Sequence, residues 1–233
     1  MNYYTARNYL KEAKEFYEHG DDYWATEYTK NALIYDNKYA DAYLFKTTLF
    51  LKWNNYEACI APIRSAIKYS DEPTEEMYFV YGKCLYKTGA KEEAFPHLLK
   101  VYESDPKKDS LGMFIGDIYA NTKLDYASAA RAYKMFFDNH RNSVDAALGV
   151  ADAYYKLNKF KESTDFYNIV LRINDENPDA LYGIAKCCFK DEGLFQEGCK
   201  NALMASKLGN TKADVLLATY CRDSSTAVTN SLP

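Results

Sequence analysis

The sequence repeats itself with a period of 34–35 residues, and this internal repeat constrains the fold more than any other feature. The segment beginning at Val144 resembles the segment beginning at Pro178, and the two starts lie 34 residues apart. Walking back along the chain, at spacings of 35, 34, 35 and 34, gives earlier starts near Asp109, Glu75, Ala40 and Ala6. A period of this length with two amphipathic segments per repeat predicts stacked helical hairpins.

The third repeat shows why each unit should be a pair of helices. One face of its first helix carries, at offsets of 0, 3, 4 and 7, the residues Tyr78, Tyr81, Gly82 and Leu85. Gly89 ends this helix, because glycine accepts the left-handed conformation needed there. Ala94, Leu98 and Val101 follow at helical spacing and form the face of the second helix. The small residues Gly82 and Ala94 let the two helices approach closely.

Small residues recur at two fixed places in the repeats. The first helices carry Ala13, Thr47, Gly82, Gly116, Ala151 and Ala185, and the second helices open with Ala25, Cys59, Ala94, Ala129, Ser163 and Gly198. Over roughly residues 6–210 this pattern resembles the tetratricopeptide repeat family. The resemblance implies an all-α fold, a right-handed α-solenoid of stacked antiparallel helix hairpins. The fourth and sixth repeats depart from it by one extra residue at the turn, around Leu124 and around Glu192.

We therefore expect one array over residues 1–221. Its repeats lie near 6–39, 40–74, 75–108, 109–143, 144–177 and 178–210. We expect residues 211–221 to form a capping helix, since a repeat stack needs a terminal helix to cover its last apolar face. Residues 222–233 are polar and rich in Ser and Thr, which predicts a disordered tail.

Composition and charge narrow the compartment and the partners. The net charge of −4 gives no long-range attraction to nucleic acid or to anionic membranes. No stretch of 18 apolar residues is present, so we expect no membrane insertion, and the N-terminus lacks the uncharged apolar core of a secretory signal. The six cysteines follow no framework spacing, which predicts free thiols and a reducing, cytoplasmic compartment.

Residues that could carry chemistry are scattered. The histidines His19, His97 and His140 occupy unrelated offsets in different repeats, so no metal-binding pair is expected. Cys187 and Cys188 are adjacent, and metal binding by them is a minor alternative to burial as small residues. No phosphate-binding glycine loop or nucleophile elbow is present. We expect no enzyme, no cofactor and no metal, unless the repeats are an accessory piece of a longer chain.

The family resemblance places the ligand-facing positions on the first helices, which line the concave wall of the superhelix. Its apolar and aromatic positions are Leu10, Leu44, Phe79, Met113, Leu148 and Tyr182, with a second line of Tyr17, Leu51, Tyr86, Tyr155 and Phe189. Beside them run Lys14, Lys52, Lys83, Lys87, Asn121, Lys156, Lys186 and Lys190, with Asp117 and Asp152 at two of the matching positions.

This groove predicts a protein–protein interaction module: an adaptor, scaffold or co-chaperone-like protein that binds a partner segment, apolar with some acidic character. The family's two-carboxylate clamp is absent, because Leu10 and Glu76 are among the residues at its basic and polar positions. Two alternatives remain open. The lysines could merely complement helix dipoles while part of the apolar lines is core. The chain could also be a self-associating structural subunit, with the abundant tyrosines at the interface.

Overall fold

The structure is a computed structural model that describes residues 2–105 and 111–221, and these residues form helices and turns without a strand. The N-terminal unit, Met1–Pro106, contains α1 (Asn2–Glu18), α2 (Asp22–Tyr35), α3 (Ala40–Lys52), α4 (Tyr56–Tyr69), α5 (Glu75–Lys87) and α6 (Lys91–Ser104). The C-terminal unit, Lys107–Pro233, contains α7 (Leu111–Ile118), a π-helical turn η1 (Tyr119–Lys123), α8 (Tyr126–Asn139), α9 (Val144–Lys156), α10 (Phe160–Ile173), α11 (Pro178–Cys188), a 3₁₀ turn η2 (Glu192–Leu194), α12 (Phe195–Lys207) and α13 (Thr211–Tyr220).

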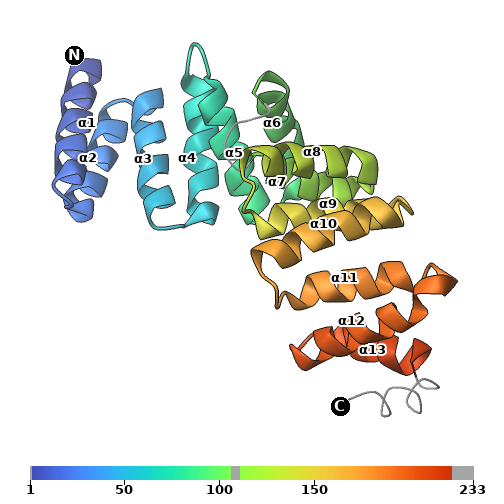
Figure 1. Ribbon diagram of the computed structural model, residues 1–233. Coiled ribbons are helices and arrows are strands. Elements are labelled where there is room, and N and C mark those ends of the chain that lie inside the picture. Colours follow the sequence, from blue (N-terminus) through green and yellow to red (C-terminus); the bar gives the residue numbers. More distant parts are fainter. Residues whose placement is uncertain (1, 106–110, 222–233) are drawn as a thin grey trace. The chain divides into compact units, whose positions relative to one another are not determined.

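Consecutive helices pair into antiparallel hairpins, which we number 1 to 6 from the pair α1/α2 to the pair α11/α12 (Figure 1). Within each unit, the second helix of a hairpin packs against the first helix of the next hairpin. The predicted all-α class of stacked hairpins is thus confirmed in the described residues. A single array spanning both units stays a prediction, and the predicted disordered tail, 222–233, lies outside the described residues.

Turns inside the hairpins repeat one backbone conformation. Hairpins 1 to 5 each place one residue in the left-handed region, at Gly20, Asn54, Gly89, Leu124 and Asn158. Glycine and asparagine accept this conformation readily, whereas leucine does not. The extra residue expected near Leu124 is absorbed by the π-helical turn η1, which leads directly into that leucine. In hairpin 6 the extra residue falls in the 3₁₀ turn η2.

Side-chain caps fix where the helices begin. Asp21, Asn55, Thr74, Asp125, Ser143 and Asn177 each accept a hydrogen bond from the backbone N–H three residues later. Such a cap satisfies one of the free donors of the first turn and is worth about 1 kcal/mol. The polar capping residues therefore recur along the repeats, as the small residues of the core do.

The small positions predicted from the sequence hold large side chains of the neighbouring helix. A Cβ on Gly82 would lie 2.7 Å from the side chain of Leu98 in α6, so a larger residue there would force Leu98 to shift. In the C-terminal unit the inserted side chains are larger. The ring of Tyr133 in α8 lies against both Gly116 and Gly149, which belong to α7 and α9. These close approaches join the two helices within a hairpin and, at Gly149, the helices of adjacent hairpins.

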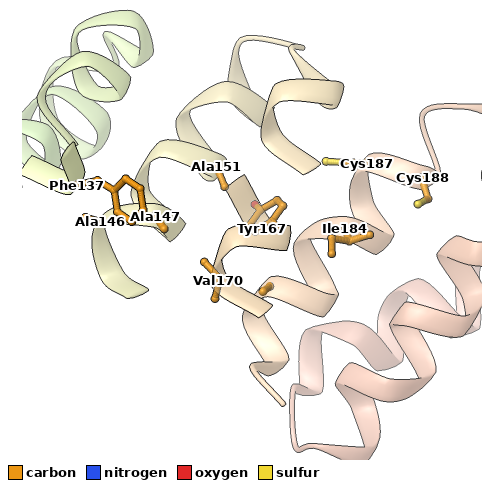
Figure 2. Close-up of a cluster of buried hydrophobic side chains, with 10 residues drawn as sticks. Phe137, Ala146, Ala147, Ala151, Tyr167, Val170, Ile184, Cys187 and Cys188 are labelled. Atoms are coloured by element: carbon orange, nitrogen blue, oxygen red, sulfur yellow. The ribbon is translucent and has the colours of Figure 1, made fainter. Parts of the chain in front are cut away.

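Tyr167 of α10 is the centre of the main core of the C-terminal unit. Its side chain is almost fully buried and packs among residues of α8 to α11 (Figure 2). Figure 2 shows Ala151, Ile184 and Cys187 around it. In the N-terminal unit the corresponding core of hairpins 1 and 2 is built from Ala6, Leu10, Ala13, Ala25, Ala32, Tyr39, Ala42, Phe45 and Leu49.

The outer face of α1 is polar where the next first helix is apolar. Ala42, Phe45 and Leu49 of α3 are buried against hairpin 1, whereas the residues 34 positions earlier are Asn8, Lys11 and Glu15. These three residues line an open hollow of about 810 Å³, and Lys11 and Glu15 form an exposed ion pair. A polar lining of this kind favours water over a packed hairpin.

The cysteines correct one prediction. Cys59 in α4 is bonded to Cys84 in α5, and Cys199 in α12 is bonded to Cys221 just beyond α13. Free thiols are found only at Cys187 and Cys188, which are buried. The expectation of six free thiols is therefore wrong for four of them. The cytoplasmic location stays a prediction, and its thiol argument now rests on two residues, since disulfides persist mainly in oxidising compartments.

Candidate functional site

Residues of η1, α8, α9 and α11 line one cavity of the C-terminal unit. A cavity of about 540 Å³ opens where η1, α9 and α11 approach each other, and it is lined by Ala120, Asn121, Leu124, Tyr126, Tyr133, Gly149, Asp152, Ala153, Tyr155, Lys156, Tyr182 and Lys186. Five of these residues are predicted groove residues: Asn121, Tyr155, Lys156, Tyr182 and Lys186. Five residues that the family resemblance predicts for the groove thus lie together at one hollow in this unit.

Lys186 lies at the centre of the polar contacts of the cavity. Its ammonium group lies 4.6 Å from the ring centre of Tyr155 and 4.8 Å from that of Tyr182. It also pairs with a carboxylate oxygen of Asp152 at 3.6 Å. An ammonium held between two aromatic rings and a carboxylate has few rotamers left. Lys186 is therefore a fixed part of the wall, and its charge is largely compensated by Asp152.

Lys156 differs from Lys186 although both line the cavity. The side chain of Lys156 is exposed, and it makes no ion pair with the residues that the structure describes. The lining therefore contains two lysines and one carboxylate, and the compensated lysine is Lys186. The cavity keeps one uncompensated positive charge at its edge, beside the half-buried ring of Tyr155.

Two buried tyrosines of second helices also reach this surface. The hydroxyl of Tyr167 donates a 2.5 Å hydrogen bond to Asp152, although the tyrosine belongs to α10. Tyr133 of α8 lines the cavity directly. Burial, together with the negative charges of Asp117 and Asp152, raises the pKa of Tyr133 far above its usual value. Both phenols stay protonated. Each ring fits between the first helices because glycines face it.

The N-terminal unit contains a related arrangement in hairpins 1 and 2. The ammonium group of Lys52 lies 4.8 Å from the ring centre of Tyr17, as Lys186 lies over Tyr155. Lys52 also pairs with Asp22 at 2.6 Å, and Trp53 donates its indole N–H to the same carboxylate at 3.0 Å. These hydrogen bonds, that of Lys52 first, lower the pKa of Asp22.

The remaining predicted residues occupy different environments. Leu10 and Phe79 are buried in the core and have little surface to offer a partner. Phe189 stacks on Tyr220 of α13 at 4.6 Å, which covers part of its ring. Half-buried side chains are Tyr17, Leu44, Leu51, Lys83, Tyr86, Met113 and Leu148, and exposed ones are Lys14, Lys52, Lys87 and Lys190. Of these, Met113 and Leu148 pack against the core of the C-terminal unit.

The lysine positions also fit the alternative explanation. Lys52, Lys87, Lys156 and Lys186 each lie in the last turn of a first helix. A positive charge there complements the helix dipole by about 0.3–1 kcal/mol whether or not a ligand binds. The position of the lysines alone therefore does not establish a ligand site. The convergence of Lys156, Tyr155 and Tyr182 on one cavity is the observation that goes beyond the dipole.

The three histidines of the chain do not line this cavity. His19 and His140 contact backbone oxygens of their own helices, and His97 lies against the rings of Tyr78 and Tyr81. In the described ranges no group of three or more histidine, cysteine or acidic side chains is arranged to hold a metal ion. None of the helices over those ranges is both long and apolar enough to cross a membrane.

The repeat pattern does not indicate that the second helices contribute to this surface. Tyr133 and Tyr167 have the spacing of core residues, and both are buried. The signal that could have placed them at the groove is the glycine opposite each ring, at Gly149 and Gly183, where other repeats carry larger residues. A large aromatic side chain facing a glycine on the neighbouring first helix can extend through to the far surface.

Comparison with known proteins agrees with this architecture. Residues 122–178 match the sequence model of the tetratricopeptide repeat family. Among curated proteins none matches the chain. A solved structure described as YrrB, a TPR protein with an unusual peptide-binding site, is 16% identical, with a TM-score of 0.66 over 74% of this chain and 88% of that one.

Two further solved structures cover nearly the whole chain. PilF of Pseudomonas aeruginosa is 20% identical, with a TM-score of 0.60 over 93% of this chain and 98% of that one. The C-terminal part of a TPR repeat-containing protein from Cytophaga hutchinsonii is 13% identical, with a TM-score of 0.68 over 94% of this chain and 90% of that one. The predicted resemblance is thus confirmed: this chain folds as a tetratricopeptide repeat protein, and residues 122–178 carry the family's sequence pattern.

Proposed function

We propose that this protein is an interaction scaffold that holds a segment of a partner protein on the first helices of the C-terminal unit. The observation that carries the proposal is the convergence of Asn121, Tyr155, Lys156, Tyr182 and Lys186 on one cavity of about 540 Å³. A cavity of this size accepts one or two side chains of a peptide. The solved structure of YrrB is described as having a peptide-binding site, which supports a similar use of this fold.

The lining suggests the chemistry of the partner segment. Tyr155 and Tyr182 are half-buried rings that offer flat apolar area at little entropic cost. Lys156 supplies the uncompensated positive charge next to them. A segment with an apolar or aromatic side chain followed by Asp or Glu would satisfy both features. No step of this function requires catalysis, and the fold is typical of scaffolds without enzymatic activity.

The test is selection of peptides from a random display library, followed by titration of the selected peptides against variants. We expect the peptides to combine an apolar or aromatic residue with an acidic one. Tyr155→Ala with Tyr182→Ala should weaken binding about tenfold or more, because hot-spot aromatics carry much of the affinity. Tyr23→Ala is the matched control, since Tyr23 is an exposed tyrosine of the N-terminal unit at 67% exposure.

A charge reversal tests the second part of the proposal. Lys156→Glu should abolish selection of acidic peptides and enrich basic ones, because the charge at the cavity edge changes sign. Peptides that bind the wild type and all of these variants equally well would contradict a groove site in the C-terminal unit. Failure to select any peptide from the library would contradict the scaffold proposal itself.

Self-association is the second candidate, and exposed aromatic side chains of the N-terminal unit favour it. Trp24 and Trp53 are 45% and 44% exposed, and Tyr23 lies beside Trp24 at 5.2 Å between ring centres. Aromatic side chains at this exposure are enriched at protein interfaces. Light scattering over a concentration series separates the two candidates. A monomer of about 27 kDa supports an open groove, whereas a dimer that persists on dilution supports the assembly subunit.

A further inference from the structure

The last helix of the described residues, α13, occupies the place of a first helix in the repeat. It begins at Thr211, 33 residues after α11 begins at Pro178, and it packs against α12 and α11 of hairpin 6. Asn210 caps it by accepting a hydrogen bond from the N–H of Lys212 at 3.1 Å. The helix therefore covers one face of hairpin 6.

The packing of α13 is much thinner than that of a true first helix. Ala213 is its one buried residue, whereas α11 buries seven. Its other contacts are polar or partial: Ser206 donates to Asp214 at 2.5 Å, and the ring of Tyr220 stacks on Phe189 with 4.6 Å between ring centres. A ten-residue helix is marginal in water on its own, so these contacts alone give α13 little stability.

The Cys199–Cys221 disulfide adds a covalent restraint to α13, which its packing contacts stabilise only weakly. It joins α12 to the residue directly after α13, so it closes the helix against its neighbour at the far end from the Asn210 cap. Both of its cysteines are half-buried. The other disulfide, Cys59–Cys84, lies between α4 and α5, and both of its cysteines are fully buried. A thiolate in solution can therefore approach the first bond but not the second without local unfolding.

We propose that the Cys199–Cys221 disulfide is a redox-sensitive clasp that holds α13 over the end of the groove. A dithiol reductant attacks one sulfur, forms a mixed disulfide and then closes its own ring. The protein disulfide takes up two electrons and two protons to become two thiols, and the dithiol becomes a disulfide. Reduction releases α13 from hairpin 6 and uncovers Phe189, the last aromatic residue of the predicted groove line.

Hydrogen exchange followed by mass spectrometry tests this on the intact protein, before and after treatment with dithiothreitol. Alkylation and peptide mapping show which bond is open at each time. We expect Cys199–Cys221 to open before Cys59–Cys84. Peptides from α13 should then exchange about 100-fold faster, the change expected when a bond closing a loop of this length is lost. Peptides from α9 and α10 in the same sample should keep their protection.

Two variants make the result specific. Cys199→Ser with Cys221→Ser should show the fast exchange of α13 without reductant. Cys59→Ala with Cys84→Ala, the matched pair, should leave α13 as protected as in the wild type. The clasp is overturned if α13 keeps its protection once alkylation proves Cys199 and Cys221 free. It is equally overturned if the oxidised protein already has both thiols free for alkylation. Neither result depends on whether the groove binds a peptide.

Discussion

The hydroxyl of Tyr167 donates a hydrogen bond to the carboxylate of Asp152 at 2.5 Å, so a residue of the second-helix layer contacts the groove surface of the first helices. Asp152 in turn pairs with Lys186, which lies between Tyr155 and Tyr182. The core and the candidate site of the C-terminal unit are therefore one connected structure. We therefore expect a substitution of the buried Tyr167 to affect the surface site through Asp152.

Gly183→Ala should destabilise the protein through Tyr167. A Cβ at position 183 would overlap the phenol ring, which is fixed in the core and cannot move aside. We expect a loss of about 2–3 kcal/mol in the free energy of unfolding, measured in urea, as for other overpacked cores. Gly193→Ala is the control, because its Cβ would meet only the Asp191 carboxylate at 3.3 Å. Equal effects of the two substitutions would contradict the proposed ring contact.

Stability should fall at alkaline pH because of the buried phenols. Burial first, then the charge of Asp152, raises the pKa of Tyr167 well above its usual 10.0, while the unfolded chain keeps the usual value. The unfolded state therefore releases a proton above pH 10 that the folded state keeps. The contribution is fully present below pH 10 and is lost as the pH rises, at about 1.4 kcal/mol per pH unit for each such residue.

Tyr167→Phe isolates this contribution. The variant should lose about 1 kcal/mol at pH 7 with the hydrogen bond, yet its free energy of unfolding should fall less steeply between pH 10 and pH 11. Urea unfolding at pH 7, 9, 10 and 11 measures both effects. Tyr4→Phe is the control, because Tyr4 is 73% exposed. Parallel pH curves for the wild type and Tyr167→Phe would show that Tyr167 does not titrate differently in the fold.

Leu124→Asn should stabilise the protein. Leu124 has a φ of 56° and is 62% exposed, so it carries the strain of the left-handed conformation while burying little of its side chain. Asparagine holds the equivalent turns at Asn54 and Asn158. We expect a gain of about 1 kcal/mol, read as a raised melting temperature. Leu203→Asn, at an exposed leucine inside the helix α12, should give no such gain.

The fold could be predicted from the sequence because every repeat carries the same pattern of small and large residues. Small residues such as Gly82 and Ala151 recur with one period, and so do the large residues that pack opposite them. A helical hairpin accommodates this pattern in each repeat. The turn at Leu124 could not be specified, since leucine carries no preference for a left-handed turn. The extra residue of the fourth repeat indicated an irregular turn near Leu124. The π-helical turn that absorbs this residue depends on the surrounding packing.

The disulfides could not be predicted from cysteine spacing along the chain, because each bond joins residues on neighbouring helices of the stack. Cys59 lies in a second helix and Cys84 in the following first helix, and such helices pack together within each unit. The site was predicted in part for a similar reason. Repeat positions identify residues on the first helices, such as Tyr155 and Tyr182, but not how deeply each is covered. Leu10 and Phe79 share those positions and are buried.

Protonation of Asp22 should be visible in the fluorescence of Trp53. The indole N–H of Trp53 donates to Asp22 at 3.0 Å, and Lys52 holds the same carboxylate at 2.6 Å. Since these hydrogen bonds lower the pKa of Asp22 below its usual 3.8, its charged form persists to more acid pH in the folded protein. The stabilising contribution is present above pH 4 and is lost as the pH falls further.

The chain has two tryptophans, so Trp24→Phe leaves Trp53 as the sole reporter. In this background we expect a change in the emission of Trp53 with a midpoint below pH 3.8, while the helical circular dichroism still shows a folded protein. Adding Asp22→Asn should remove the transition, because the amide does not titrate. A transition of the same midpoint in both proteins would mean that Trp53 senses another carboxylate. No transition before unfolding would mean that Trp53 and Asp22 are not paired in solution.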